Sequence, residues 1–183
     1  MNRCFILPGV LFVLLTALLL ASCRSNTSGA GASDPLVGTV APVFSAPVLD
    51  AEGAFSLSDL RGKVVLIDFW AIFCGPCRES MPHLQEFFQR YSPDRLAIIS
   101  VNLDPNSGDR RDRVRDYLRR GGFTFPVVID NGRIAGLYGA ARIPRLVLVD
   151  AAGQVARVFQ GRTDPGVIAD AIDLLLNDPA PQP

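Results

Sequence analysis

The stretch Val64-Val65-Leu66-Ile67-Asp68-Phe69-Trp70-Ala71-Ile72-Phe73-Cys74-Gly75-Pro76-Cys77 decides the fold of this 183-residue chain. Its first half, residues 64–70, is apolar except for Asp68, which is typical of a central strand buried on both faces. Residues 76–91 then repeat apolar side chains at helical spacing. The two cysteines are therefore predicted at a strand-to-helix turn, where a dithiol can give up two electrons as one disulfide.

The predicted helix start gives the two cysteines different roles. Cys74 is expected near unpaired backbone N–H groups and the positive end of the helix dipole, which lower the pKa of a thiol, so we interpret it as the attacking group. Cys77 is expected one turn further in, less exposed, where it resolves the mixed disulfide. A zinc ligand pair is the alternative. Zinc would need two more ligands, and the chain without its expected N-terminal signal segment offers only His83 and carboxylates for this role. We therefore expect no metal and no other cofactor.

Asp68 is the third candidate catalytic residue, because a carboxyl group inside an apolar strand is costly without a role or a partner. Burial is expected to raise its pKa, which makes the carboxylate a plausible base for the Cys77 thiol. A capped or ion-paired structural Asp is the alternative that the sequence leaves open. Elsewhere, Pro144 precedes another apolar strand and is a candidate for a cis peptide bond in a tight turn.

Both ends of the chain are expected to lie outside the folded domain. Residues 1–22 combine a basic start, an apolar run short for a membrane span and small residues before Cys23, a pattern that resembles a bacterial lipobox. The resemblance implies cleavage before Cys23 and lipidation of that residue; an ordinary signal peptide and an uncleaved anchor are the alternatives. Residues 23–35 are predicted to form a flexible tether, 36–177 the domain and 178–183 a proline-rich tail.

Composition narrows the class of function. Eighteen basic and 18 acidic residues cancel, so net charge gives no reason to expect nucleic-acid binding. Of the four cysteines, Cys4 leaves with the signal segment and Cys23 carries lipid, which leaves one closely spaced pair in the mature chain. In an oxidising compartment such a pair is more typical of a redox centre than of a structural disulfide.

Strand-like and helix-like stretches alternate along residues 36–177, which indicates an α/β fold. A short hairpin is expected near residues 51–57. Further strands are predicted over residues 96–103, 125–129, 146–149 and 155–159. Helices are predicted over residues 110–120, 134–138 and 165–176, the last with Asp164 as its N-cap.

These motifs together resemble the thioredoxin superfamily. The resemblance is carried by the segment 65–77, by Pro82 in the following helix, by the approach 138–144 to a proline and by the closing hairpin 146–159. It implies a thioredoxin fold, with a central mixed β-sheet flanked by helices.

The same resemblance implies roles for site residues. Pro144 is then cis and lies against the dithiol, and Asp68 is the buried acid of the family. Substrate is expected to contact four residues: Ile143, Pro144, Trp70 and Pro76.

The opening of the domain resembles the TlpA/ResA-like membrane-tethered thiol–disulfide oxidoreductases. The segments 41–44 (APVF) and 57–63 (LSDLRGK) carry this resemblance, together with a helical insertion between Leu103 and Phe125. An N-terminal β-hairpin extension belongs to the expected fold.

Phe73 and Arg145 are among the departures from the family pattern. Phe73 stands where tryptophan is usual, and Arg145 follows the proline where thioredoxins carry threonine. We expect Arg145 to be solvated or, alternatively, to favour the Cys74 thiolate or an acidic partner. The arginines of the insertion are expected on a solvated, salt-bridged helix face, with docking to an anionic partner or a membrane as the alternative.

The resemblance implies a lipid-anchored thiol–disulfide oxidoreductase that faces the periplasm or extracytoplasmic space of a bacterial cell envelope. We expect a reductant, because the Gly75-Pro76 spacer resembles that of reducing thioredoxins. A membrane protein of DsbD/CcdA type is the expected electron donor. Disulfides of extracytoplasmic proteins, such as apocytochrome c or copper-site proteins, are the expected substrates.

Three alternatives remain at this stage. The chain could be a disulfide oxidant or isomerase, or a peroxiredoxin-like antioxidant, which shares the Ala-Pro-x-Phe opening. The third alternative is a non-catalytic metallochaperone or assembly module.

Overall fold

The structure is a computed structural model that describes residues 34–177. The expected signal segment 1–22, the lipidation site Cys23, most of the tether and the tail 178–183 lie outside the described residues. Within residues 34–177, no helix has the length and apolar character needed to cross a membrane.

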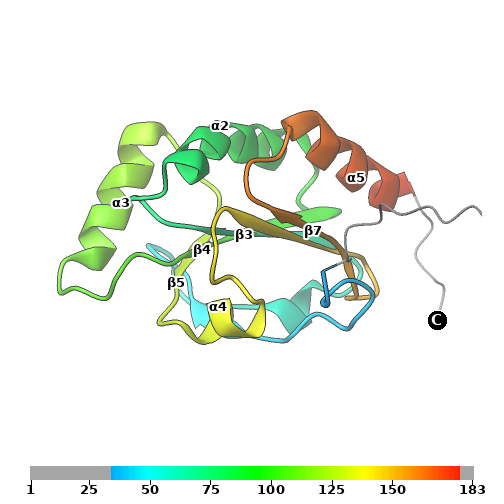
Figure 1. The fold of residues 1–183 in the computed structure, drawn as a ribbon, viewed down its shortest axis with the longest axis horizontal. Coiled ribbons are helices and arrows are strands. Elements are labelled where there is room, and N and C mark those ends of the chain that lie inside the picture. The colour runs from blue at the N-terminus through cyan, green and yellow to red at the C-terminus, as the bar shows by residue number, and fades with distance from the viewer. Residues whose placement is uncertain (1–33, 178–183) are drawn as a thin grey trace, which may run out of the picture. The chain divides into compact units, whose positions relative to one another are not determined.

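A five-stranded mixed sheet forms the centre of the domain (Figure 1). Its strands, in spatial order, are β5 (Val127–Ile129), β4 (Leu96–Asn102), β3 (Val64–Trp70), β6 (Arg145–Val149) and β7 (Val155–Gln160). β3, β4 and β5 run parallel, whereas β6 is antiparallel to β3 and β7 is antiparallel to β6. Strand β3 lies in the middle and is buried at all seven positions, as its apolar run predicts.

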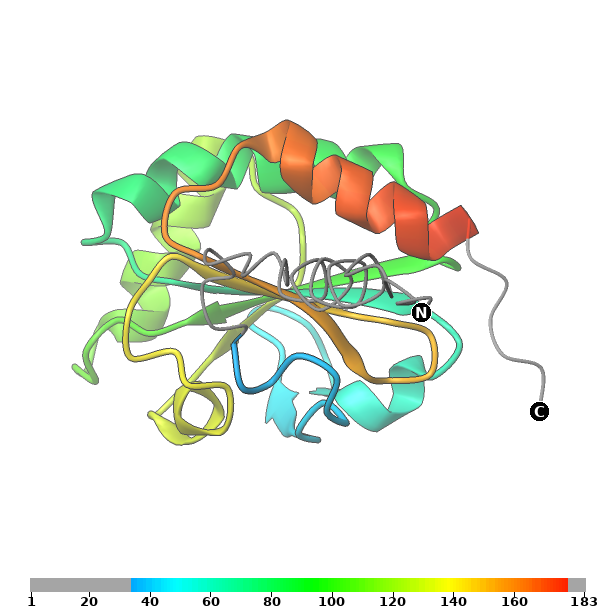
Figure 2. The ribbon, with the colours of Figure 1, turned by 45° about the vertical axis from the view of Figure 1, so that its right-hand side comes forward.

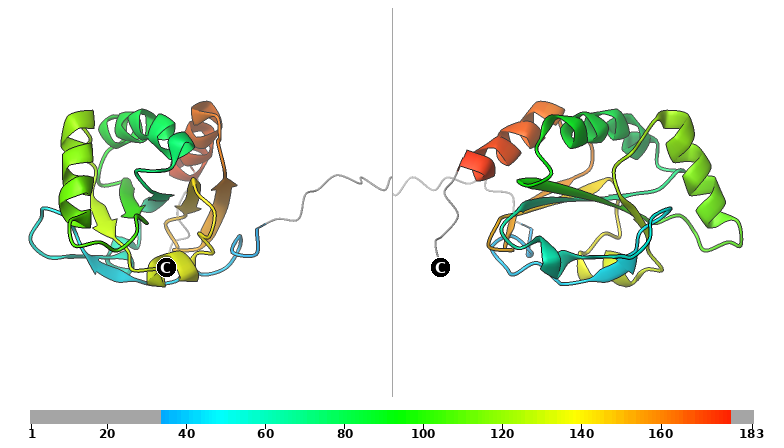
Figure 3. Two further views of the ribbon diagram at one scale, coloured as in Figure 1. Left: turned by 60° about the vertical axis from the view of Figure 1, so that its left-hand side comes forward. Right: turned by 180° about the vertical axis from the view of Figure 1, so that it is seen from behind.

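Layers of other elements cover both faces of this sheet (Figures 2 and 3). One layer contains the helices α2 (Gly75–Arg90), α3 (Arg110–Gly121) and α5 (Pro165–Asn177). The other contains α4 (Arg133–Leu137), the 3-10 helix η1 (Leu57–Leu60) and the hairpin of β1 (Ser45–Pro47) and β2 (Ala54–Ser56). The predicted thioredoxin fold, with its N-terminal hairpin and its helical insertion, is confirmed.

Alternate side chains of β3 enter two separate apolar cores, because successive residues of a strand point to opposite faces. Leu66 and Trp70 lie in the core beneath α2, α3 and α5, and Ile67 and Phe69 lie in the other core. Asp68 falls between Leu66 and Trp70 in this alternation. Its carboxyl group therefore faces the layer that contains α2 and the dithiol.

The ends of the predicted elements have local causes. Helix α3 ends at Gly122, whose φ of 69° is left-handed and whose N–H donates to the carbonyl groups of Leu118 and Arg119. The Asp164 carboxylate accepts a hydrogen bond from the Gly166 N–H at 2.8 Å, which confirms the predicted cap of α5. The 3-10 helix η1 is not among the predicted elements, because four residues are too few to display a helical period.

Candidate active site

Cys74 and Cys77 form a disulfide at the start of α2, with their sulfur atoms 2.07 Å apart. Cys74 is the N-cap residue, and its Sγ accepts a hydrogen bond from the Cys77 N–H at 3.2 Å. The same N–H and the helix dipole would stabilise a thiolate on Cys74, which supports its role as the attacking group. Cys77 is 1% exposed and Cys74 is 7% exposed, as expected of a resolving and an attacking thiol.

Asp68 is buried on the α2 side of the sheet, 3% exposed. Removal from water raises the pKa of its carboxyl group from 3.8 to about 7, against the opposing effect of a hydrogen bond from Ser100. The Ser100 hydroxyl lies opposite on β4 and donates to Asp68 Oδ2 at 3.1 Å. Within residues 34–177 this hydroxyl is the one side chain bonded to the carboxyl, so the ion-paired structural Asp considered from the sequence is not found.

A groove of about 410 Å³ opens beside the dithiol. Pro76 of α2 and Pro144 from the loop before β6 both line it, so residues far apart in sequence meet there. The Ile143–Pro144 peptide bond is cis, as the resemblance implies. Pro76 is exposed and Ile143 is half-buried, so a bound chain can reach both. The remaining lining comes from α2, the end of β7 and α5, and includes Glu79, Ser80, His83, Leu146, Gly161, Arg162, Thr163, Asp164, Pro165 and Ile168.

Trp70 does not line this groove. Its side chain is fully buried, with its ring 5.5 Å from that of Tyr117 in α3. The expectation that Trp70 contacts substrate is therefore corrected. Trp70 instead packs in the core directly before the turn that leads to the dithiol. Phe73, 68% exposed and next to Cys74, is the aromatic residue that a substrate can reach. Its position directly before the first cysteine is the sequence signal that identifies it.

Two polar residues that did not stand out in the sequence hold the turn between β3 and Cys74. Asp104 Oδ2 accepts hydrogen bonds from the Ile72 N–H at 2.9 Å and from Asn102 Nδ2 at 2.7 Å. Both side chains are buried, and Asn102 pairs with Trp70 across the parallel ladder. Their position at the end of the apolar strand 96–103 was the available signal. The anchored Ile72 amide fixes where the turn delivers Cys74.

Arg145 also differs from expectation. Its guanidinium group is buried and forms an ion pair with Asp34, with an Nη2–Oδ2 distance of 2.8 Å. It is therefore not the solvated residue expected from the sequence, and its charge is balanced by Asp34 rather than directed to the Cys74 thiolate. Asp34 was placed in the flexible tether, but in the structure it packs on the domain.

The charged residues of α3 form ion pairs, as expected for the insertion. On α3, Arg113 pairs with Asp109, Arg119 pairs with Asp116, and Arg115 lies 2.7 Å from Asp50, which gives the expected salt-bridged face. His83 is half-exposed, with its Nδ1 3.3 Å from Glu86.

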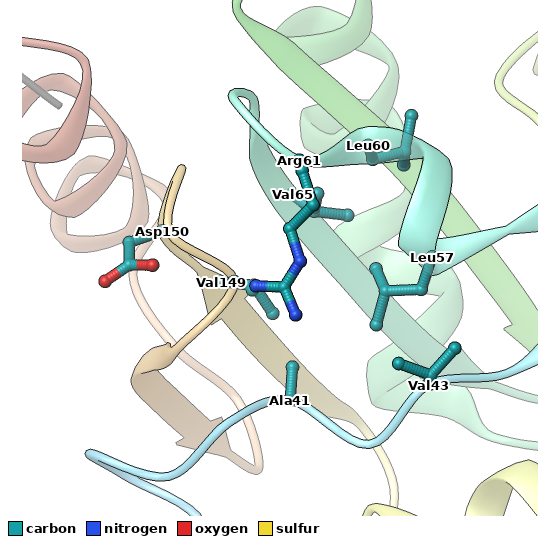
Figure 4. A pocket seen from close by; sticks show the side chains of 9 residues that line it. Ala41, Val43, Leu57, Leu60, Arg61, Val65, Val149 and Asp150 are labelled. Carbon is teal, nitrogen blue, oxygen red and sulfur yellow. The ribbon is translucent and has the colours of Figure 1, made fainter. Parts of the chain in front are cut away.

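A second hollow lies near the opposite end of β3 (Figure 4). The Arg61 side chain points into it between Leu57, Val149 and Ala41, and the free volume is only about 10 Å³. That volume holds about one water molecule, so the hollow is not a substrate site. Among the residues that the structure describes, no group of three or more His, Cys, Asp or Glu side chains is arranged to bind a metal ion.

Comparison with known proteins places this geometry in a family. Residues 37–158 match the model of the AhpC/TSA family. The chain belongs to the AhpC/TSA family. Its relatives include thiol-disulfide oxidoreductase ResA of Bacillus subtilis, 30% identical over 176 residues that cover 95% of this chain and 94% of that protein. ResA of Geobacillus thermodenitrificans is 35% identical over 127 residues, 68% of this chain and 70% of that protein.

A solved structure with a related name also matches this chain. A putative thiol:disulfide interchange protein DsbE from Chlorobium tepidum matches with a TM-score of 0.69 and 32% identity, covering 79% of this chain and 99% of that one. With its Cys-x-x-Cys pair at the start of α2, this family member is a thiol–disulfide oxidoreductase.

The raised pKa of Asp68 predicts a pH-dependent stability. Between pH 3.8 and about 7 the folded state holds a proton on Asp68 that the unfolded chain has lost. The free energy of unfolding contributed by this group should therefore fall as the pH rises through this window, by on the order of 4 kcal/mol, and stay level above it. Urea unfolding of the oxidised protein between pH 4 and 8 should reveal the fall, and Asp68→Asn should abolish it.

Asp109→Asn is the control, because the Asp109 carboxylate is exposed. This variant should keep the wild-type slope. An unchanged slope in Asp68→Asn would show that Asp68 is ionised in the folded protein at low pH.

Proposed function

We propose that this oxidoreductase is a reductant, which transfers electrons from Cys74 and Cys77 to disulfides of extracytoplasmic proteins. The observation that carries the proposal is the buried Asp68 carboxyl on the dithiol side of the sheet. A dithiol is a strong oxidant when its reduced form is stabilised as a thiolate. When ionised, the buried Asp68 carboxylate opposes a second negative charge on the same side of the sheet, and Arg145, the buried cation after Pro144, is neutralised by Asp34. The reduced form is thus less stabilised, which favours a low potential.

The reaction runs in two displacements. The Cys74 thiolate attacks one sulfur of the substrate disulfide, forms a mixed disulfide and releases the other sulfur as a thiolate. Asp68 then accepts the proton of Cys77, whose thiolate attacks Cys74 Sγ and releases the second substrate sulfur. The substrate gains two electrons and leaves as two thiolates, which take up from water the equivalent of the two protons released by Cys74 on ionisation and by Cys77 through Asp68. Cys74 and Cys77 end as the observed disulfide.

The groove beside the dithiol supplies the place for the substrate chain. The Pro144 carbonyl already accepts a hydrogen bond from the Gly161 N–H at 2.8 Å. Substrate backbone is therefore expected to pair with Ile143, with Pro76 and the exposed Phe73 on either side of the reacting sulfur atoms. Main-chain pairing of this kind accepts many sequences, because it reads no side chain.

The lipobox-like segment supports the proposed location, and the resemblance to membrane-tethered oxidoreductases supports the proposed partners. Lipidation of Cys23 would tether the domain to a bacterial membrane. Because an extracytoplasmic compartment oxidises thiols, the oxidised pair needs a donor, for which we propose a membrane protein of DsbD/CcdA type. Apocytochrome c and copper-site proteins are the proposed substrates.

Removal of the resolving thiol should trap substrates. In Cys77→Ser, mixed disulfides on Cys74 should accumulate in cells, because nothing displaces the bound sulfur. On a gel they appear as covalent complexes, which dithiothreitol separates by reducing the mixed disulfide. Mass spectrometry then identifies the partner. Cys74→Ser, which retains one thiol but lacks the attacking group, should trap none. Equal trapping by both variants would contradict the assigned order of attack.

The reduction potential tests the direction of electron flow. Equilibration of the full-length protein with dithiothreitol or glutathione buffers should give a value well below about −180 mV, nearer the ~−270 mV of thioredoxin. A higher value would favour an oxidant or an isomerase. Peroxide consumption that survives Cys77→Ser would favour the peroxiredoxin-like alternative.

Asp68→Asn should slow the second displacement while sparing the first. Loss of a general base typically costs about 100-fold, so release of substrate at pH 7 should fall by that order. Release by the wild type should accelerate as the pH rises through about 7, whereas in the variant the acceleration should depend on ionisation of the Cys77 thiol itself and lie at higher pH. Quenched-flow measurement with a labelled peptide disulfide separates the two steps.

Ser100→Ala is the matched control for this pH profile. Loss of the Ser100 hydroxyl removes a hydrogen bond that lowers the pKa of Asp68. The midpoint of the pH profile for substrate release should therefore move to higher pH. Identical profiles in the wild type and in Asp68→Asn would exclude Asp68 as the base.

A further inference from the structure

We propose that Arg145, held by its ion pair with Asp34, is a positioning residue for the loop that presents substrate to the dithiol. This loop, called the Pro144 loop below, comprises residues 138–144. The proposal rests on the proposed function, since it concerns how that site receives a protein disulfide.

The Arg145 guanidinium group bonds in three directions. Its Nε donates to the Tyr138 carbonyl at 2.8 Å, its Nη1 to Gln160 Oε1 at 3.0 Å and its Nη2 to Asp34 Oδ2 at 2.8 Å. The planar fork of an arginine matches such fixed directions, and a lysine does not. One side chain thus joins the start of the Pro144 loop, the end of β7 and the segment that enters the domain.

Gln160 extends this hold to the other end of the loop. Its Nε2 donates to the carbonyl groups of Arg142 at 3.1 Å and of Pro144 at 3.2 Å. Because Arg145 Nη1 occupies the Gln160 oxygen, the amide nitrogen is directed at the loop. The Pro144 loop is therefore held at its start by Arg145 directly and at its end through Gln160.

Asp34 provides the counter-charge that this arrangement needs. The side chains of Arg145 and Asp34 are only 6% and 21% exposed, and a buried guanidinium without a partner is strongly destabilising. The second carboxylate oxygen of Asp34 accepts from the Leu36 N–H at 3.1 Å, which orients the carboxylate. Without the charge of Asp34, the guanidinium would turn toward water and lose its bonds to the loop.

The Asp34→Asn variant of the full-length protein tests the proposal with two substrates. A peptide disulfide must pair with the Pro144 loop, whereas a small aromatic disulfide such as DTNB reaches Cys74 without it. The KM for the peptide should rise about tenfold, which corresponds to ~1.4 kcal/mol of binding, with kcat and the reduction of DTNB within about twofold of wild type. Hydrogen exchange of the Gly161 amide, bonded to Pro144, should accelerate.

Two variants serve as controls. Asp34→Glu keeps the charge and should restore the wild-type KM to within about threefold. Asp173→Asn removes the same charge from a surface pair, in which Asp173 of α5 lies 3.5 Å from Arg90. This variant should change the kinetics with neither the peptide nor DTNB. An unchanged peptide KM in Asp34→Asn, or a parallel loss with both substrates and a matching fall in melting temperature, would overturn the proposal.

Failure of the proposed function has a different signature. Wild-type protein that reduces no peptide disulfide would refute the reductase, and exchange of the Gly161 amide would then still decide whether Asp34 positions the loop. Slow exchange in both the wild type and Asp34→Asn would overturn the positioning role.

Discussion

Strand β3 has a hydrogen-bonded neighbour on each edge and an apolar layer on each face, so the carboxyl group of Asp68 is almost completely removed from bulk water. The strand tolerates this polar group because burial raises its pKa to about 7, which leaves it uncharged below that pH, and because the Ser100 hydroxyl donates a hydrogen bond to it. The same strand delivers the turn that carries Cys74. The burial that stabilises the sheet therefore also sets the proton affinity of Asp68 on the dithiol side of the sheet, so a change in burial alters the pKa of this acid.

Polar contacts hold the dithiol and the substrate loop from opposite sides of β3. On the β4 side, Asp104 and Asn102 fix the turn before Cys74. On the β6 side, Arg145 fixes the approach to Pro144. The side chains of Asp104, Asn102 and Arg145 are all buried, and each of them bonds to a backbone group. The reacting sulfur atoms and the groove thus keep a defined spacing, although each belongs to a loop.

The fold was predictable because its signals are local. The apolar run of β3 and the helical spacing of α2 each lie within one window of sequence, and the superfamily resemblance links Cys77 to Pro144. The contacts of Arg145 and Asp104 were not predictable in this way. Asp34 and Arg145 are 111 residues apart, and Asp104 and Ile72 are 32 apart, so only the folded chain brings them together. The substrate role expected of Trp70 failed for the same reason, because the covering Tyr117 comes from the insertion.

Trp70 is the one tryptophan among the 183 residues, and it lies fully buried in the same apolar core as Cys74 and Cys77. Intrinsic tryptophan fluorescence from this chain therefore originates at a single place, directly before the turn to the dithiol. Its ring lies against that of Tyr117 in α3, with the ring centroids 5.5 Å apart, so the indole is part of the packing of this core. The protein thus contains its own optical probe of the redox centre, which reads the packing of that turn without any added label.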